Sequence, residues 1–296
     1  MDIAEKYAQP EVVAFWQQFS HEGLQACEAM MLTRYAPPPA TVLDLGCGSG
    51  RAGLALAPQG YEVTGLDITW PMVVAARVLY LQAGLQPDLL QADMRAIPCQ
   101  AASYDVVLIL IAALQHIRKR AARQAALAEI GRILRPGGVL ILALDNIAPA
   151  LTCYGWWGWR KVRSLGKNGQ AANSDHSADA LLASRRQQMS GPGWHLRGLA
   201  RTVRWRTWNG LLDYGRHWHV LAGEPGDTAI NQVSLMATDG HVYYHLYQHD
   251  ELVSDAAAAG LELAGYHSGR ELNEGCTFAP IVRQLDKQVL YAFRRP

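Results

Sequence analysis

Short apolar runs alternate with helical patterns between residues 41 and 144, and this alternation restricts the fold more than any other feature of the chain. Strands that alternate with helices form βαβ units, in which the strands are parallel and helices cover both faces of the sheet. We therefore predict an α/β fold with a doubly wound, Rossmann-like sheet. The predicted strands are 41–45, 61–66, 88–92, 104–110 and 138–144.

Helix signals lie between these runs. Pro71 follows the possible cap Thr69, and apolar residues then recur at helical spacing up to Gly84. A second helix is predicted over 118–133, and the sequence RPGG at 135–138 is expected to stop it.

The alternating region and the segments on either side of it divide the chain into four predicted parts. Residues 1–36 have helical character and end at an APPPA linker, so we expect a helical cap near the ligand site. Residues 37–146 are the predicted core. Residues 147–240 interrupt the alternation and are expected to form a substrate cover, and 241–296, with strand-like runs at 261–268 and 288–294, are expected to complete the core sheet.

The expected cover differs in chemistry from the rest of the chain. It holds seven of the nine tryptophans, and residues 151–220 contain eleven Lys or Arg against three Asp, although the whole chain of 296 residues has a net charge of only +1. Tryptophan and arginine together suit an aromatic or carboxylate-bearing small molecule, and they also suit RNA. A solvated amphipathic segment is the plainer interpretation.

Composition also argues against several classes of protein. The start of the chain lacks a signal-peptide pattern, and the sequence contains no apolar run of membrane-spanning length, so we expect a cytoplasmic protein that does not act in a membrane. The five cysteines are scattered without a CxxC pair, and no HExxH pattern occurs, so neither a disulfide framework nor a metal site is expected.

The stretch VLDLGCGSGRAG, residues 42–53, places glycines between a predicted strand and a predicted helix. Such a turn lets a ligand approach the main chain and the free N–H groups of the helix. Gly48, Gly50 and Gly53 also satisfy GxGxxG, the dinucleotide fingerprint, but a single match of this kind is weak.

Three acids at successive strand ends help to decide whether the glycine turn binds a dinucleotide or another ligand. Asp44 would repel a pyrophosphate but can hold a cationic amino group. Asp67 is placed to accept both hydroxyls of a ribose. Asp93 can accept a hydrogen bond from an exocyclic amine while Met94 packs on a purine ring. This set favours a ligand with a cationic end, a ribose and an adenine, although acids are also common at strand ends for structural reasons.

These motifs resemble those of class I S-adenosylmethionine-dependent methyltransferases. LDLGCGSG is similar to their glycine motif, GYEVTGLDIT to their ribose-binding strand, and QADM to their adenine motif, over residues 40–146 and more loosely over 240–296. The resemblance implies S-adenosylmethionine as cofactor, S-adenosylhomocysteine as product, and an antiparallel last strand in a mostly parallel sheet. It implies these cofactor-binding residues: Asp44, Gly46, Cys47, Gly48, Gly50, Asp67, Ile68, Asp93, Met94 and Leu110.

The sequence defines less well which residues bind the molecule that accepts the methyl group. His116 in LQHI is the candidate general base, because a residue just past the fourth strand faces the transferred methyl group in this family. Simple packing is the alternative for His116. YYHLYQHDEL at 243–252 resembles the closing region of tRNA wobble-uridine methyltransferases. The candidate substrate contacts are Asn146, Tyr244, His245 and Trp205, with at most one of Tyr244 and His245 facing inward.

We therefore expect a methyltransferase that acts on nitrogen or oxygen of a small organic acceptor. An RNA methyltransferase, in particular one acting on tRNA, is the first alternative. A cofactor-binding regulatory protein without turnover is the second, and a dinucleotide enzyme is the weakest.

Overall fold

The computed structural model describes residues 3–145, 227–231, 241–277, 283, 286 and 288–296. The chain divides into two compact units, residues 1–150 with 220–296, and residues 151–219. Everything below concerns the first unit, because the second lies outside the described residues.

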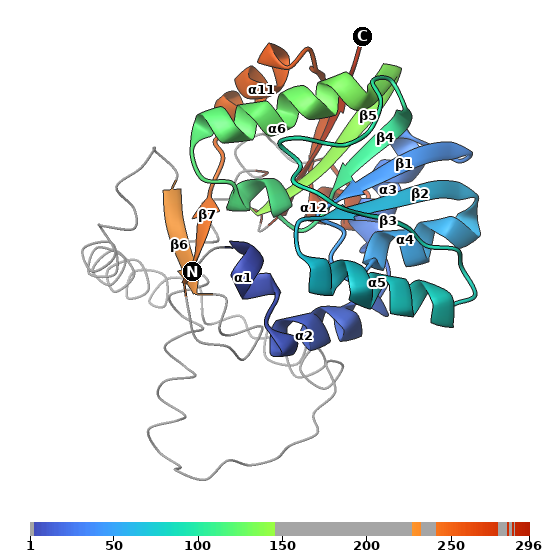
Figure 1. Ribbon diagram of the computed structural model, residues 1–296. Helices are drawn as coiled ribbons and strands as arrows, with labels where there is room; N and C mark the ends of the chain where they lie inside the picture. The colour runs from blue at the N-terminus through green and yellow to red at the C-terminus, as the bar shows by residue number, and fades with distance from the viewer. Residues whose placement is uncertain (1–2, 146–226, 232–240, 278–282, 284–285, 287) are drawn as a thin grey trace, which may run out of the picture. The chain divides into compact units, whose positions relative to one another are not determined.

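A seven-stranded sheet in the order β3-β2-β1-β4-β5-β9-β8 forms the centre of this unit (Figure 1). β1 pairs in parallel with β2 and β4, β2 with β3, and β4 with β5, whereas β9 runs antiparallel to both β5 and β8. The predicted α/β fold with a mostly parallel sheet and an antiparallel last strand is confirmed. The strands are β1 (Ala40–Leu45), β2 (Tyr61–Asp67), β3 (Asp88–Gln91), β4 (Tyr104–Ile109), β5 (Leu134–Asp145), β8 (Glu262–Ser268) and β9 (Gln288–Arg294).

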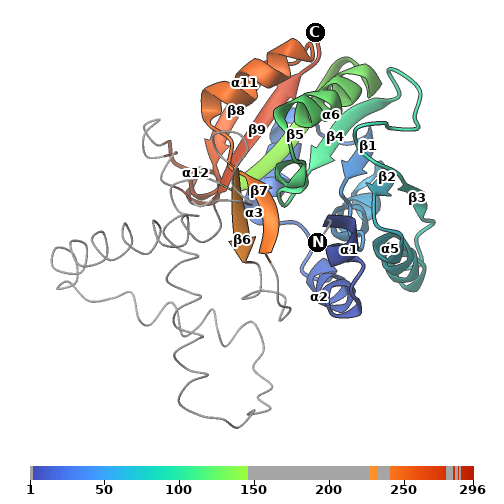
Figure 2. The same ribbon diagram turned by 60° about the vertical axis from the view of Figure 1, so that its left-hand side comes forward.

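Helices cover both faces of the sheet, as the apolar strands require (Figure 2). α6 and α11 pack on one face through residues such as Leu127 and Leu252, and α3, α4 and α12 pack on the other through residues such as Met31 and Leu56. α5 lies beside α4. The helices are α1 (Ile3–Tyr7), α2 (Pro10–Ser20), α3 (Ala26–Tyr35), α4 (Arg51–Leu56), α5 (Trp70–Gln82), α6 (Arg120–Ile133), α11 (His249–Ala258) and α12 (Gly269–Glu274), with the 3-10 turns η1 (Ala57–Gln59) and η2 (Ala113–His116).

The start of β5 differs clearly from the predicted one, at residue 134 and not at residue 138. α6 ends at Ile133, and β5 starts at once with Leu134, so RPGG lies within the assigned strand and not between helix and strand. The cause is the extended backbone of Leu134 (φ −65°, ψ 141°), which lets this residue pair with Tyr104 before the register shifts.

The tyrosine-rich strand β7 (His241–His245) does not join the central sheet. It pairs antiparallel with β6 (Asp227–Asn231), which lies in the segment expected to be the substrate cover. The structure thus places one short strand from that segment in the same unit as the core. Among the described residues, no helix is long and apolar enough to cross a membrane.

Candidate functional site

A cavity of about 320 Å³ lies at the carboxyl ends of β1, β2 and β4. Parallel strands bring their carboxyl ends to one edge of a sheet, so the motifs that follow the strands meet there although the sequence separates them. The N-terminal helices contribute Ile3, Tyr7, Trp16 and Ser20 to its walls, in the place where a cap was expected. Of the predicted cofactor-binding residues, those lining the cavity are Asp44, Gly46, Cys47, Gly48, Asp67, Ile68, Asp93, Met94 and Leu110.

The glycine turn between β1 and α4 leaves bare backbone at the cavity. Gly46 and Gly48 have φ of 72° and 54°, a left-handed conformation that side chains disfavour. A Cβ atom on Gly48 would meet no protein atom within 4 Å, so a side chain there would enter open space. The backbone at Gly48 can therefore approach a ligand closely.

Gly50, also predicted to bind cofactor, does not line the cavity. A Cβ atom on Gly50 would lie 2.5 Å from the ring of Tyr80, and one on Gly53 would lie closer still to the Tyr80 hydroxyl. These two glycines thus let α4 pack against α5, and direct contact between Gly50 and cofactor stays a prediction.

Asp67 occupies the end of β2 and holds the glycine turn in place. One carboxylate oxygen accepts a hydrogen bond from the backbone N–H of Gly48 at 2.9 Å, and the other accepts one from the backbone N–H of Thr69 at 2.8 Å. Burial raises the pKa of Asp67, while these N–H groups act in the opposite direction. Each oxygen keeps a second lone pair, so the carboxylate can also accept from two vicinal hydroxyls of a ligand.

Asp44 is buried at the end of β1 and has no hydrogen-bond partner within the described part of the chain. Burial raises its pKa to about 7, and the carboxylates of Glu28 and Asp67 act in the same direction. Arg51 partly offsets them, but its guanidinium already binds Glu28 at 2.7 and 2.8 Å. An uncompensated acid that faces a cavity fits a cationic ligand group.

Asp93 and Met94 follow β3 and line the same cavity. The side chain of Arg95 donates to both carboxylate oxygens of Asp93, and this pairing lowers the pKa of Asp93. Asp93 is therefore charged, and Arg95 already uses part of its capacity to accept hydrogen bonds. Adenine recognition by Asp93 and Met94 stays a prediction.

His116 lies in η2 and also lines the cavity. Its Nδ1 is 3.0 Å from the backbone carbonyl oxygen of Tyr243, an atom that only accepts, so Nδ1 carries the hydrogen. Its Nε2 then accepts from the Tyr7 hydroxyl at 3.2 Å. Burial lowers the pKa of His116 to about 4, so the ring is neutral near pH 7 and its Nε2 can act as a base.

Of the four predicted substrate contacts, two lie outside the described residues and two do not line the cavity. Asn146 and Trp205 are outside the described residues. Neither Tyr244 nor His245 lines the cavity: Tyr244 donates to Oε1 of Gln115 at 3.0 Å, and His245 Nε2 lies 2.9 Å from Oε1 of Glu251. Substrate contact by these two residues stays a prediction.

Tyr243 and Arg118 are among the cavity residues that sequence reasoning missed. The alternation of faces along β7 could have grouped Tyr243 with His245, opposite Tyr244, but only the hairpin with β6 shows where that face lies. Nothing in the sequence around Arg118 distinguishes it from a solvated arginine.

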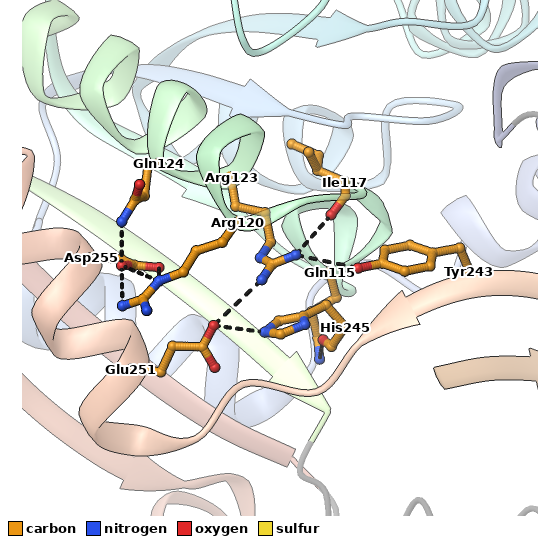
Figure 3. A network of polar contacts seen from close by, with 9 residues as sticks. All are labelled: Gln115, Ile117, Arg120, Arg123, Gln124, Tyr243, His245, Glu251 and Asp255. Atoms are coloured by element: carbon orange, nitrogen blue, oxygen red, sulfur yellow. Dashed lines mark hydrogen bonds and ion pairs between the residues drawn. The ribbon is translucent and has the colours of Figure 1, made fainter. Parts of the chain in front are cut away.

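A network of polar contacts joins α6, α11 and β7 behind this part of the cavity (Figure 3). Arg123, fully buried on α6, donates to the carbonyl oxygen of Ile117 and to the hydroxyl of Tyr243, each at 3.3 Å, and lies 3.4 Å from Glu251. The network therefore fixes both the loop after His116 and the tyrosine on β7.

Comparison with known proteins identifies a methyltransferase domain in the core of the chain. Residues 42–138 match a family model described as "Methyltransferase domain". A SAM-dependent methyltransferase from Methanosarcina mazei has the same fold, with a TM-score of 0.55 and 17% identity over 90% of this chain and 96% of that one.

Residues 42–138 thus form a methyltransferase domain, and the fold is that of a known S-adenosylmethionine-dependent methyltransferase.

Two curated methyltransferases match the core in sequence. A malonyl-[acyl-carrier protein] O-methyltransferase of Enterobacter lignolyticus is 34% identical over 135 residues, which are 45% of this chain and 51% of that protein. A ubiquinone biosynthesis O-methyltransferase of Xanthomonas axonopodis pv. citri is 32% identical over 152 residues, 51% of this chain and 62% of that protein. The chain thus spans roughly half to three fifths of these relatives, and the likeness centres on the methyltransferase core.

Proposed function

We propose that this protein transfers a methyl group from S-adenosylmethionine to nitrogen or oxygen of a small organic acceptor. The observation that carries the proposal is the meeting, in one cavity, of three strand-end acids with a neutral, half-buried histidine. The acids suit the cofactor, and the histidine suits proton removal from an acceptor. The match of residues 42–138 to a methyltransferase domain supports the same function.

The residues present fit the cofactor. The partnerless carboxylate of Asp44 matches its cationic amino group, the remaining lone pairs of Asp67 match the ribose hydroxyls, and the open backbone at Gly48 allows close approach. When bound, the cofactor supplies an electrophilic methyl group on a sulfonium, whose departure leaves a neutral thioether. The protein then has to orient the acceptor and exclude water.

Tyr7 and His116 form the route for the acceptor's proton. The Tyr7 hydroxyl donates to Nε2 of His116, so an acceptor O–H or N–H that donates to the Tyr7 oxygen completes a chain of two hydrogen bonds. As the acceptor atom gains the methyl group its proton becomes acidic, and the proton moves to Tyr7 while the Tyr7 proton moves to His116. The low pKa of His116 is sufficient for a hydroxyl acceptor, because the O-methylated oxonium is the stronger acid; a methylated aliphatic amine is the weaker acid and would keep its proton.

A calorimetric titration with S-adenosylhomocysteine tests the cofactor assignment. Asp67→Ala removes a charge-assisted double contact, so we expect the dissociation constant to rise at least about tenfold. Glu62→Ala is the matched control, because Glu62 is exposed at the other end of the same strand. Equal affinity of the wild type and Asp67→Ala would contradict the ribose assignment, and no uptake by the wild type would remove the proposed function.

A further inference from the structure

Arg118 is the one cation lining the cavity, within the described part of the chain, that has no acidic partner. The cavity walls contain two other arginines, and each is paired: Arg51 with Glu28 at 2.7 Å and Arg95 with Asp93 at 2.5 Å. The acids that line the cavity, Asp44, Asp67 and Asp93, belong to the strand ends assigned to the cofactor. The described walls around Arg118 therefore present an uncompensated positive charge.

The position of Arg118 leaves its hydrogen-bond donors available. Its guanidinium carbon lies 5.0 Å from the centre of the Tyr243 ring, a cation–π contact. Stacking on a ring occupies the flat face of the guanidinium and leaves the N–H groups at its edge free. That edge matches the two oxygens of a carboxylate or phosphate.

Two hydrogen bonds fix Tyr243, the residue whose ring lies under Arg118, one at its hydroxyl and one at its backbone carbonyl. The Tyr243 hydroxyl accepts from Arg123, and the Tyr243 carbonyl accepts from His116 Nδ1. Arg123 also donates to the carbonyl of Ile117, the residue before Arg118, as Figure 3 shows. A buried arginine thus fixes both the platform and the chain segment that carries Arg118, which reduces the cost of ordering them when a ligand binds.

A second donor on the cavity wall also lacks an acceptor. The Nε1–H of Trp16 is buried and makes no hydrogen bond within the described residues. Trp16 stacks on Tyr7, the proposed proton carrier, with ring centres 6.3 Å apart. This part of the cavity is therefore aromatic and positively charged, and it adjoins the proposed proton route.

From these contacts we propose that the methyl acceptor is a small, largely apolar or aromatic molecule that carries a carboxylate or phosphate group, and that Arg118 binds this oxyanion. The inference rests on the proposed methyltransferase function and names its substrate class. The oxyanion fixes the acceptor at Arg118, and its nitrogen or oxygen then faces Tyr7 and the methyl donor.

Calorimetry on the full chain saturated with S-adenosylhomocysteine tests this inference. The probes are benzoate, phenyl phosphate and the neutral analogue benzamide. We expect at least one anion to bind at least about tenfold more tightly than benzamide, because only an anion gains the charge-assisted pair. The tighter of the two anions identifies carboxylate or phosphate as the preferred group.

Two variants separate this site from a general effect of charge. Arg118→Gln should lose the tenfold preference. Arg34→Gln should keep it, because Arg34 also lies over a tyrosine ring, at 5.7 Å from the centre of Tyr35, but does not line the cavity. Equal binding of anions and benzamide, no anion binding up to about 20 mM, or an undiminished preference in Arg118→Gln would overturn the inference. Each of these results leaves the separate titration with S-adenosylhomocysteine intact, so failure here is distinct from failure of the proposed function.

Discussion

Burial shifts the pKa values of two cavity residues, Asp44 and His116, and it does so in opposite directions. It raises the pKa of the Asp44 acid to about 7 and lowers that of the His116 base to about 4. In both cases the neutral form is favoured in the free protein. For Asp44 this opposes binding of a cation, whereas for His116 it keeps a lone pair available.

The raised pKa of Asp44 predicts a conflict between stability and binding. Because the folded pKa exceeds the ordinary value of 3.8, the folded state holds more protons than the unfolded state between pH 4 and 7, and stability falls as pH rises through that window. Asp44→Asn should therefore raise the free energy of unfolding at pH 8 by at least about 1 kcal/mol, with little gain at pH 4. Urea denaturation at both pH values measures this, and an equal change at both would refute the assignment.

The same carboxyl predicts how cofactor affinity depends on pH. A cationic ligand needs ionised Asp44, and the ionised fraction falls about tenfold between pH 8 and pH 6 when the pKa is about 7. The dissociation constant for S-adenosylhomocysteine should rise by that factor in the wild type. In Asp44→Asn it should be high at both pH values.

The contact between His116 and Tyr7 leads to two expectations: kcat depends little on pH, and removal of the Tyr7 hydroxyl lowers kcat. Since the pKa of His116 is about 4, kcat at saturating cofactor should not fall from pH 8 to pH 5 through protonation of this base. Tyr7→Phe should lower kcat at least about tenfold, because the hydrogen-bond chain to Nε2 is broken. Tyr35→Phe is the control, since Tyr35 makes a similar contact with His267 at 2.9 Å away from the cavity. Equal kcat in Tyr7→Phe and the wild type would exclude the proposed proton route.

At the scale of helices and strands, local sequence patterns predicted those strands and strand-end residues that depend on neighbouring residues in the chain. The apolar runs around Val42, Val63 and Val106 became strands because buried parallel strands need apolar side chains on both faces. The acids Asp44 and Asp67 were found because a motif gives their distance from a strand end. In this part of the chain the sequence predicted the fold, and it predicted two acids that the structure places in the cavity wall.

The acceptor side could not be predicted in the same way, because it depends on long-range packing. Tyr243 lines the cavity instead of Tyr244 because β7 pairs with β6 and because Arg123, 120 positions earlier, binds its hydroxyl. Period-two alternation states that neighbours face opposite ways but not which face is inward. The partners of Tyr243 lie too far away in the chain for any local pattern to show them.

The network between α6, α11 and β7 predicts a large cost for removing Arg123. Arg123→Met leaves the hydroxyl of Tyr243 without this donor and Glu251 without this cation, so the free energy of unfolding should fall by about 2–4 kcal/mol. Arg135→Met should cost less than about 1 kcal/mol, because Arg135 and Asp105 form an exposed pair, with side chains 43% and 40% accessible. Urea denaturation measures both. Similar losses in the two variants would show that the buried network adds no special stability.

At the scale of the whole molecule, near-neutral charge coexists with a basic segment. The chain carries a net charge of +1, yet residues 151–220 hold eleven Lys or Arg against three Asp. Such a segment could neutralise RNA phosphates and is the basis for RNA as an alternative acceptor, whereas tRNA in particular rests on the resemblance of residues 243–252 to tRNA methyltransferases. The described walls of the cavity instead combine aromatic side chains with one arginine, Arg118, that has no acidic partner among the described residues, and this composition suits a small anion.

The two acceptor classes therefore differ in their response to salt and to competing tRNA. If the acceptor is a small molecule, excess tRNA should not inhibit its methylation at about 150 mM salt, where non-specific binding has dissociation constants of about 1–100 μM. Methylation of an anionic aromatic panel, followed as formation of S-adenosylhomocysteine with and without tRNA, makes the comparison. Filter binding between about 50 and 200 mM salt supplies the control, since phosphate contacts give affinities that fall steeply over this range. Methyl transfer to tRNA itself, with none to the panel, would establish the basic segment as the substrate-binding surface and reject a small acceptor.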